Sequence, residues 1–352
     1  MSSITLRAIA ICSNLLSYRR KRLRPFFASY PITLRCNLRC VFCEGWKLKK
    51  SMELRTLEAE RVIDQLAAIG VRILGITGGE PLVRKDFEEI ANYAQKKGII
   101  VGVNTNGTLI TWQRARAITR VCDMVFVSLD GFEKTHDKLR GQYGSFNGAV
   151  AGLKRLVAVK GRCAIGVNFV LNKENYREFI PFSRWLKSFN VPVTLAPVVG
   201  ADGIHSCTTL SIPENKVDDF VHSLLREKQT NPLISPSEKV IKFFPLFIRG
   251  TMPKICDAGF LYLGVSPMGE LKICPIVPNS QEWIVGSLLK SSGKELLESE
   301  RFSDLLKARC LCEPCLAGCT TPYSLLARDS PLGIAKEAFA YYKCLGGKHV
   351  WN

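Results

Sequence analysis

Apolar residues in the first two-thirds of the chain follow two alternating patterns. Short segments such as VRILGIT (71–77) are almost continuously apolar, which is typical of strands buried on both faces. Between them lie segments such as Leu57–Ala68, whose apolar residues recur at the spacing of one helix face. The pattern predicts six strands, at residues 32–34, 71–77, 99–105, 124–130, 163–171 and 191–199. It predicts helices between them, at residues 57–68, 87–97, 111–120, 146–160 and 176–189.

Strands that alternate with helices form a parallel sheet, and right-handed crossovers make it either a doubly wound sheet or a barrel. In both architectures the ligand site lies at the carboxyl ends of the strands. Four unusual stretches follow the first four strands: three cysteines, then GGEP (78–81), NTNGT (104–108) and SLDG (128–131). We therefore expect these four stretches to meet at one mouth of an α/β core.

The alternation stops after residue 212, where the chain changes character. Residues 213–227 predict one more helix, and the proline-rich residues 229–255 predict a connection. Beyond it cysteines dominate, and GVSPMGELKIC (264–274) predicts a hairpin with Met268 and Gly269 at its turn. The 352 residues suffice for one large domain and a smaller one. The expected division is an N-terminal extension (1–29), a core (30–230) and a cysteine-rich domain (231–352).

The net charge of +18 is concentrated near the N-terminus, where residues 1–50 carry eleven basic residues and one acid. Such a block suggests an anionic partner, although a solvated basic face is equally compatible with it. Residues 3–23 join an apolar stripe to a basic run, which fits a helix on an anionic membrane surface or one packed over the core. No segment resembles a secretory signal or a membrane span. We expect a cytoplasmic protein with reduced thiols, and residues 1–29 as a possible contact with the inner face of the membrane.

The segment RCNLRCVFC (35–43) spaces three cysteines as C-x3-C-x2-C. A structural zinc site needs four ligands, and no histidine lies near this segment. Three thiolates instead suit an iron–sulfur cube in which one iron stays open for a small molecule. The candidate ligands are Cys36, Cys40 and Cys43.

With Phe42 as the aromatic residue, this segment resembles the C-x3-C-x-aromatic-C motif of the radical S-adenosylmethionine (SAM) superfamily. The resemblance covers roughly residues 31–200 and implies a partial (β/α)6 barrel of the TIM type. It also implies a [4Fe–4S] cluster held by the three cysteines, with S-adenosyl-L-methionine bound to the fourth iron. Reductive cleavage would give a 5′-deoxyadenosyl radical that abstracts hydrogen from a substrate. An electron donor such as ferredoxin or flavodoxin would supply the electron.

The motifs at the other strand ends extend the resemblance. GITGGEP (75–81) is similar to the family segment that binds the methionine amino group, although an ordinary strand-to-helix turn would also explain it. NTNGT and SLDG occupy the positions at which relatives contact the ribose and the carboxylate. The arginine of HDKLRG matches one that pairs with the carboxylate, and Val167–Val170 would pack on adenine or in the core. The implied cofactor contacts are Phe42, Gly78, Gly79, Glu80, Asn104, Asn106, Ser128 and Arg140; no catalytic residue is assigned.

A second group of seven cysteines resembles the SPASM extension, which holds two auxiliary [4Fe–4S] clusters. Family order would assign Cys256, Cys274 and Cys319 to one cluster. The middle cysteines are more closely spaced than in the family pattern, C-x-C-x2-C-x3-C instead of C-x2-C-x5-C-x3-C. A single auxiliary cluster and a zinc ribbon therefore stay open. The second cluster would take Cys310, Cys312, Cys315 and Cys344.

Together these features predict a radical SAM enzyme with a SPASM-type extension. The resemblance favours a ribosomal peptide or protein as the substrate. A membrane lipid or lipid-linked substrate and a cofactor precursor are the alternatives, and nucleic acid is a less favoured partner. A non-catalytic iron–sulfur electron carrier would be expected to lack the motifs that bind S-adenosylmethionine, whereas this sequence keeps GGEP and all three loop cysteines.

Overall fold

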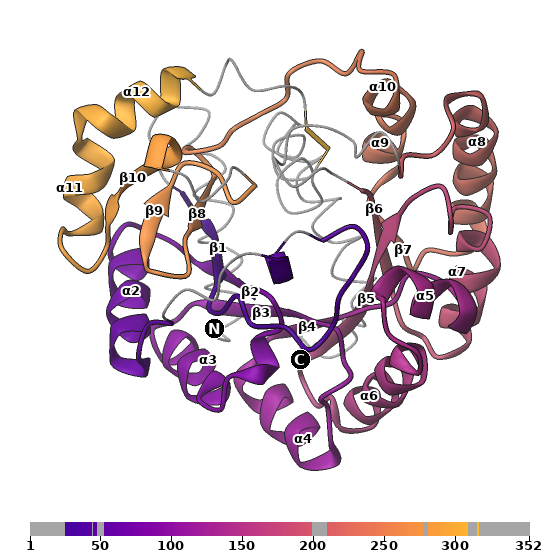
Figure 1. Ribbon diagram of the computed structural model, residues 1–352, viewed down its shortest axis with the longest axis horizontal. Coiled ribbons are helices and arrows are strands. Elements are labelled where there is room, and N and C mark those ends of the chain that lie inside the picture. The colour runs from indigo at the N-terminus through magenta and orange to yellow at the C-terminus, as the bar shows by residue number, and fades with distance from the viewer. Residues whose placement is uncertain are drawn as a thin grey trace, which may run out of the picture.

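The computed structural model describes residues 25–43, 45–47, 53–198, 210–276, 281–308 and 315–316. These residues contain one ten-stranded sheet with the strand order β10-β9-β8-β1-β2-β3-β4-β5-β6-β7. Figure 1 shows the sheet as an arc, with helices α2 to α8 along its outer side. Strands β1 to β7 are parallel to one another, and β8 is parallel to β1.

The first six strands confirm the predicted partial (β/α)6 barrel. Each lies beside the next in sequence order, and helices alternate with them along the chain. The strands are β1 (Phe27–Pro31), β2 (Ile73–Thr77), β3 (Ile100–Thr105), β4 (Met124–Ser128), β5 (Ala164–Leu171) and β6 (Val193–Pro197). The helices are α2 (Thr56–Ala68), α3 (Phe87–Lys96), α4 (Trp112–Val121), α5 (Glu133–Arg140), α6 (Ser145–Val159), α7 (Phe179–Ser188) and α8 (Glu214–Thr230).

Side chains alternate between the two faces of each strand, and the two faces differ in chemistry. On β3, Val101 and Val103 are buried in the main core between sheet and helices, whereas Asn104 is exposed on the concave face. Burying each such aliphatic side chain contributes roughly 1.5–3 kcal/mol. The outward face therefore stabilises the barrel and leaves the concave face for polar groups.

A smaller apolar cluster closes the concave face at the amino ends of the strands. Phe26, Phe27 and Ile73 pack there with Leu261 and Tyr262 from a segment far along the chain. The backbone N–H groups of Phe26 and Phe27 donate to the carbonyl oxygen of Leu261 at 3.0 and 3.2 Å. This cluster forms the floor of the barrel, opposite the mouth.

Three local predictions differ from the structure. The first strand lies at Phe27–Pro31 rather than at 32–34, and α5 was not predicted. The prediction of a connection over 229–255 was wrong, because this segment folds into short elements whose apolar residues join the core. These elements are β7 (Ile234–Ser235), α9 (Glu238–Ile241) and α10 (Phe244–Ile248).

The C-terminal part of the described chain extends the barrel sheet. β8 (Tyr262–Val265) and β9 (Glu270–Lys272) form the predicted hairpin, with Gly269 at φ +77° in its turn. The sheet therefore runs across the expected boundary at residue 230, and the division into domains stays a prediction. The remaining elements are β10 (Ile284–Ser287), α11 (Gly293–Glu298), α12 (Glu300–Ala308) and the 3-10 turns η1 (Gly45–Lys47), η2 (Pro81–Val83) and η3 (Gln281–Trp283).

Some predictions lie outside the described residues. These are the amphipathic helix over 3–23 and four candidate ligands of auxiliary clusters. The four ligands are Cys310, Cys312, Cys319 and Cys344.

Candidate cofactor site at the ends of the strands

The three cysteines lie in the segment between β1 and α2, which we name the cysteine loop (residues 33–53, of which 33–43, 45–47 and 53 are described). Cys40 is buried, with 7% of its surface exposed, whereas Cys36 and Cys43 are half-buried. The backbone N–H of Leu38 donates to Cys36 Sγ at 3.4 Å, and the Arg140 guanidinium lies 3.8 Å from Cys40 Sγ. Burial raises the pKa of the Cys40 thiol, and the charge of Arg140 opposes this shift.

The GGEP segment after β2 docks directly on the cysteine loop. The N–H of Gly79 donates to the carbonyl of Thr33, and the N–H of Glu80 donates to that of Arg35, both at 2.8 Å. A Cβ on Gly79 would lie 2.2 Å from the Arg35 carbonyl oxygen. A Cβ on Gly78, whose φ is +142°, would lie 2.2 Å from the Thr33 carbonyl oxygen. Glycine is required at both positions because the two backbones touch.

The loop after β3 contacts the cysteine loop through side-chain amides. Asn37 Nδ2 donates to Thr108 Oγ1 at 2.9 Å, and Asn106 Nδ2 donates to Asn37 Oδ1 at 2.8 Å. Asn106 Oδ1 in turn accepts from the N–H of Thr108 at 3.0 Å. The structure thus brings the predicted residue Asn106 against the cysteine loop, with Asn37 as a partner that sequence analysis missed.

The carboxyl end of α5 supplies a third contact. The N–H of Arg39 donates to the Arg140 carbonyl at 3.3 Å, and the N–H of Val41 donates to the Leu139 carbonyl at 2.9 Å. The cysteine loop is therefore hydrogen-bonded to the segments that follow β2, β3 and β4. These contacts bring the cysteines, GGEP and NTNGT together as predicted, and the third neighbour of the loop is α5, which follows the SLDG motif.

Glu80 is a buried carboxylate, with 1% of its surface exposed. It accepts hydrogen bonds from the N–H of Leu82 at 3.0 Å, Thr105 Oγ1 at 2.8 Å and the N–H of Asn106 at 2.6 Å. Burial raises its pKa, and these hydrogen bonds oppose the shift. In this structure Glu80 joins the GGEP segment to the loop after β3, and its role as a cofactor contact stays a prediction.

Arg140 forms a buried ion pair with Asp130 at the mouth, with 2.6 Å between Nη2 and Oδ2. Asp130 also accepts from the N–H of Val170 at 2.8 Å. The guanidinium lies over the ring of Phe42, 5.2 Å from its centroid, and the buried Arg140 Nε donates to no atom of the described chain. Sequence analysis chose Phe42 and Arg140 but not Asp130, although the acid stands within the SLDG motif.

The concave face beside the mouth carries polar side chains on three adjacent strands. Asn168 Nδ2 on β5 donates to Asn104 Oδ1 on β3 at 2.8 Å, and Ser128 on β4 is paired in register with Asn168. Asn104 and Ser128 were predicted, and Asn168 was not. Val167, considered for adenine packing, is fully buried in the main core, so the core alternative holds for this residue.

Two of the described C-terminal cysteines, Cys256 and Cys274, lie close in sequence to the β8–β9 hairpin, and the third, Cys315, follows α12. Cys256 is exposed and lies 3.6 Å from the Tyr262 hydroxyl, whereas Cys274 is half-buried and its Sγ accepts from the N–H of Ile276 at 3.4 Å. Cys315 is half-buried. Within the described ranges, no three His, Cys, Asp or Glu side chains are grouped so as to hold one metal ion.

The donors around the three cysteines fit a [4Fe–4S] cluster. A cube bonds each thiolate to a different iron, so its ligands stand apart around it, and N–H donors toward the sulfurs are typical of such sites. Here a backbone N–H and a buried guanidinium face two of the three sulfurs. None of the described cysteines is in a disulfide, so all three thiols are available as ligands.

Residues 30–186 match the sequence family described as the radical SAM superfamily. The chain is 31% identical over 290 residues to mycofactocin maturase MftC of Mycobacterium tuberculosis, covering 76% of this chain and 69% of that protein. It is 38% identical over 164 residues to Fe-coproporphyrin III synthase of Methanosarcina barkeri, covering 46% of this chain and 41% of that protein. The chain thus spans less than half of that synthase. It belongs to the radical SAM superfamily.

Solved structures share the fold at low identity. The structure of native anSMEcpe with bound AdoMet and Cp18Cys peptide superposes with a TM-score of 0.64 at 17% identity, over 92% of this chain and 100% of that one. The structure of Streptococcus suis SuiB bound to precursor peptide SuiA superposes with a TM-score of 0.64 at 15% identity, over 91% of this chain and 77% of that one. At these identities the likeness shows that the fold is shared, and the family itself is shown by the sequence matches above. No helix in the described ranges is long and apolar enough to cross a membrane.

Proposed function

We propose that Cys36, Cys40 and Cys43 hold the cluster and that S-adenosylmethionine binds beside it, over the mouth of the barrel. One observation carries this proposal: hydrogen bonds fix the cysteine loop against the segments that follow β2, β3 and β4. When reduced, the bound cluster supplies the electron that cleaves S-adenosylmethionine. The GGEP segment, the NTNGT segment and the carboxyl end of α5 all contact the loop that carries the three thiols.

The residues of the chain orient the cofactor in this proposal. Arg140 offers a buried guanidinium to the methionine carboxylate, and Asp130 fixes its direction. Asn104 and Ser128 offer polar groups to the ribose from the concave face, with Asn168 as a further partner. The apolar floor at the other end of the barrel limits the access of water, which protects a radical from side reactions.

For the substrate we favour a ribosomal peptide or protein. The match to the mycofactocin maturase extends over 76% of the chain, beyond the barrel and into the cysteine-rich part. A second candidate is a tetrapyrrole cofactor precursor. The chain is 38% identical to Fe-coproporphyrin III synthase over the region they share, against 31% for the maturase. A lipid substrate rests only on the composition of residues 1–29.

The remaining assignments follow from the same proposal. The C-terminal cysteines hold one or two auxiliary [4Fe–4S] clusters, and an electron donor such as ferredoxin or flavodoxin reduces the cluster at the mouth. We place the enzyme in the cytoplasm, where residues 1–29 contact the membrane surface. Vesicle flotation tests that contact by comparing the full chain with a chain that begins at Pro25. This start keeps β1 (Phe27–Pro31) complete. Equal flotation of both chains would refute it.

Anaerobic reconstitution tests the chemistry. About twelve irons per chain would indicate three cubes and about eight would indicate two. Reduced enzyme with S-adenosylmethionine should release 5′-deoxyadenosine, and Cys40→Ala should abolish this release and lower the iron count. Cys163→Ala, at a buried core cysteine remote in sequence from the motifs, is the matched control. Wild-type enzyme that binds iron and forms no 5′-deoxyadenosine would refute the proposal.

The substrate classes are separated by what stimulates 5′-deoxyadenosine formation. Fe-coproporphyrin III is one probe, and any short peptide encoded beside the gene is the other. Mass spectrometry then looks for a modified product of each. A product from the tetrapyrrole and none from the peptide would replace the favoured assignment.

A further inference from the structure

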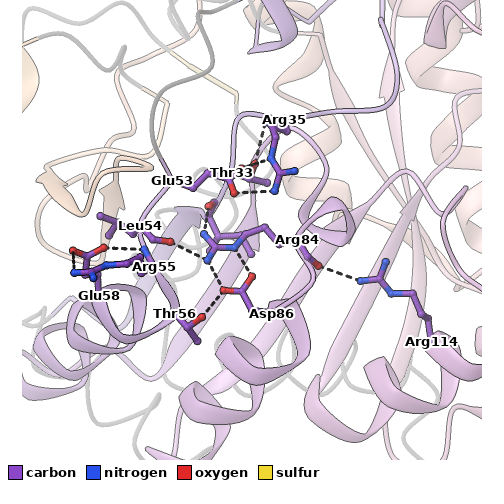
Figure 2. A network of polar contacts seen from close by, with 11 residues as sticks. Thr33, Arg35, Glu53, Leu54, Arg55, Thr56, Glu58, Arg84, Asp86 and Arg114 are labelled. Carbon is purple, nitrogen blue, oxygen red and sulfur yellow. Dashed lines mark hydrogen bonds and ion pairs between the residues drawn. The ribbon is translucent and has the colours of Figure 1, made fainter.

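A single buried arginine bridges the two ends of the cysteine loop. Arg84 follows the 3-10 turn η2 that begins at the GGEP proline, and 4% of its side chain is exposed. Its Nη1 donates to the carbonyl of Ile32, just before the loop, at 2.9 Å. Its Nη2 donates to the carbonyl of Leu54, just after the loop, also at 2.9 Å. Figure 2 shows this guanidinium at the centre of the network.

Asp86 fixes the orientation of the Arg84 guanidinium. Arg84 Nε and Nη2 donate to its two carboxylate oxygens at 2.9 and 2.6 Å, in the bidentate geometry that arginine alone provides. Thr56 Oγ1, at the start of α2, donates to Asp86 Oδ2 at 2.8 Å. The hydrogen bonds from Arg84 lower the pKa of Asp86, so the carboxylate is charged at neutral pH. The guanidinium is thus directed at the two loop ends by a charged partner.

A second connection between the loop ends lies outside the first one. Glu53, the last loop residue, accepts from Arg35 at 2.7 and 2.9 Å and from the Thr33 hydroxyl. Arg35 is largely exposed, and an exposed ion pair contributes little to stability. The buried Arg84 is therefore the stronger of the two connections.

The backbone of Arg84 is itself held in place. Arg114 donates to the carbonyl of Leu82 at 2.5 Å and to that of Arg84 at 3.5 Å. Just before this turn, the N–H groups of Gly79 and Glu80 donate to carbonyls at the start of the cysteine loop. Residues 79–84 thus contact the first residues of the loop and the residues that flank its two ends.

We propose that Arg84 is a positioning residue, which closes the cysteine loop at its base and so keeps the three cysteines placed for the cluster. The inference rests on the proposed assignment of these cysteines as ligands. Without Arg84 the thiols remain, but the loop ends separate and the conformational freedom of the loop increases. The cluster at the mouth is then released more readily, whereas clusters held by the C-terminal cysteines are not affected.

The test compares iron release from anaerobically reconstituted enzyme challenged with a ferrous chelator. The variants are Arg84→Met, Arg84→Lys and Thr56→Val, with Arg155→Met as the matched control. Arg155, on α6, is a half-buried arginine that likewise donates to a backbone carbonyl, that of Ile110 at 2.8 Å. The cluster at the mouth is followed by the change in its electron paramagnetic resonance spectrum on adding S-adenosylmethionine. Thermal unfolding is measured on the same samples.

Arg84→Met should release the cofactor-responsive cluster about tenfold faster than Arg155→Met, because two hydrogen bonds from a charged donor are lost. Arg84→Lys should be intermediate, since a lysine cannot reach both carbonyls and Asp86 together. Thr56→Val should release it about two- to threefold faster without loss of the fold. If Arg84→Met does not fold, Thr56→Val decides the question.

Three results are distinguishable. The positioning role would be overturned if Arg84→Met released iron at the same rate as the control Arg155→Met. Where Arg84→Met does not fold, the same comparison is made with Thr56→Val. Equal acceleration of all clusters, together with a lowered melting temperature, would show that Arg84 serves only overall stability, and would also overturn it. A wild-type enzyme with no cofactor-responsive cluster would instead refute the assignment of the three cysteines.

Discussion

The two groups of cysteines are built in different ways. The first three lie within eight residues of one loop, and hydrogen bonds fix that loop against three neighbouring segments. The second group is spread from Cys256 to Cys344, and its described members lie on a hairpin, on the segment before it and after α12. Cys40 is buried, whereas Cys256 is exposed.

This difference shows how far contacts within the protein determine the geometry of each group of cysteines. The described part of the loop at the mouth is hydrogen-bonded to three neighbouring segments of the barrel, so its geometry is fixed by contacts within the protein. In the proposed assignment, the second group holds clusters only when segments far apart in the sequence come together, so metal binding and folding would be coupled there. Substitutions in the packed loop should therefore have larger effects on its cluster than equivalent ones near the hairpin.

The largest effect is expected from Gly79→Ala. The new Cβ would lie 2.2 Å from the Arg35 carbonyl oxygen, so the cysteine loop must move. A clash between two backbones costs about 3 kcal/mol or more, and 5′-deoxyadenosine formation should fall about a hundredfold. Gly148→Ala on α6 is the control, because its Cβ would make an ordinary 3.4 Å contact. Activity within twofold of wild type in Gly79→Ala would contradict the docking described for this loop.

A comparable backbone clash at the β8–β9 hairpin tests whether the two groups of cysteines are independent. A Cβ on Gly264 would lie 2.5 Å from the carbonyl oxygen of Cys274. Gly264→Ala should lower the iron count of the auxiliary clusters and still allow 5′-deoxyadenosine formation without substrate, within about fivefold of wild type. If this variant lost the cofactor-responsive cluster as fully as Gly79→Ala, the two sites would not be independent.

A pH effect of intermediate size is expected at α5. His136 is buried, and its Nδ1 accepts from the N–H of Asp130 at 3.1 Å, which requires a neutral ring. Burial, and secondarily the charge of Arg140, lower the pKa of His136 to about 3. Unfolded chains take up the proton near pH 6.5 and the folded protein does not, so stability is lost as pH falls below about 6.5.

The measurement is the free energy of unfolding between pH 7.5 and 5. Wild type should lose about 2 kcal/mol more than His136→Asn over this range, because an asparagine oxygen accepts the same hydrogen bond without titrating. Parallel pH profiles for the two proteins would show that His136 does not contribute in this way.

The smallest effect is expected from Tyr262→Phe. The hydroxyl of Tyr262 lies 3.6 Å from Cys256 Sγ and accepts from the N–H of Asp257 at 3.2 Å. Losing these contacts should cost about 1 kcal/mol and change the spectrum of an auxiliary cluster more than its iron content. A loss of the cofactor-responsive cluster in this variant would show that the hairpin controls the mouth.

Hydrophobic periodicity predicted the alternating strands and helices because it is a local signal, whereas the barrel was predicted from the family resemblance. β2 to β6 and most of the outer helices lie within a few residues of their expected positions. The prediction failed at α9 and α10, which are short and lie in a proline-containing segment. Phe244 and Phe247 of α10 are buried in the core, and α10 packs on α8. Such tertiary burial leaves no periodic pattern in the sequence.

The candidate site shows the same limit. The cysteines and GGEP were found because each motif is continuous along the chain. Arg84, Asn37 and Asn168 were missed, because their partners are 52, 71 and 64 residues away and only the fold brings them together. Even Glu80, which belongs to a motif, bonds to a neighbouring loop in a way that the motif does not reveal.

The pairing of β8 with β1 has a consequence for the order in which the chain can fold during synthesis. One edge of β1 pairs with β2. Its other edge pairs with β8, and the floor residues Phe26 and Phe27 pack on Leu261 and Tyr262, so both contacts form only after residues 261–264 are synthesised. An exposed strand edge is a template for wrong pairing, so the nascent barrel keeps such an edge while most of the chain is made. The three cysteines emerge early, and the floor of their barrel closes late. On the ribosome, the cysteine loop is therefore available well before the protein around it is complete.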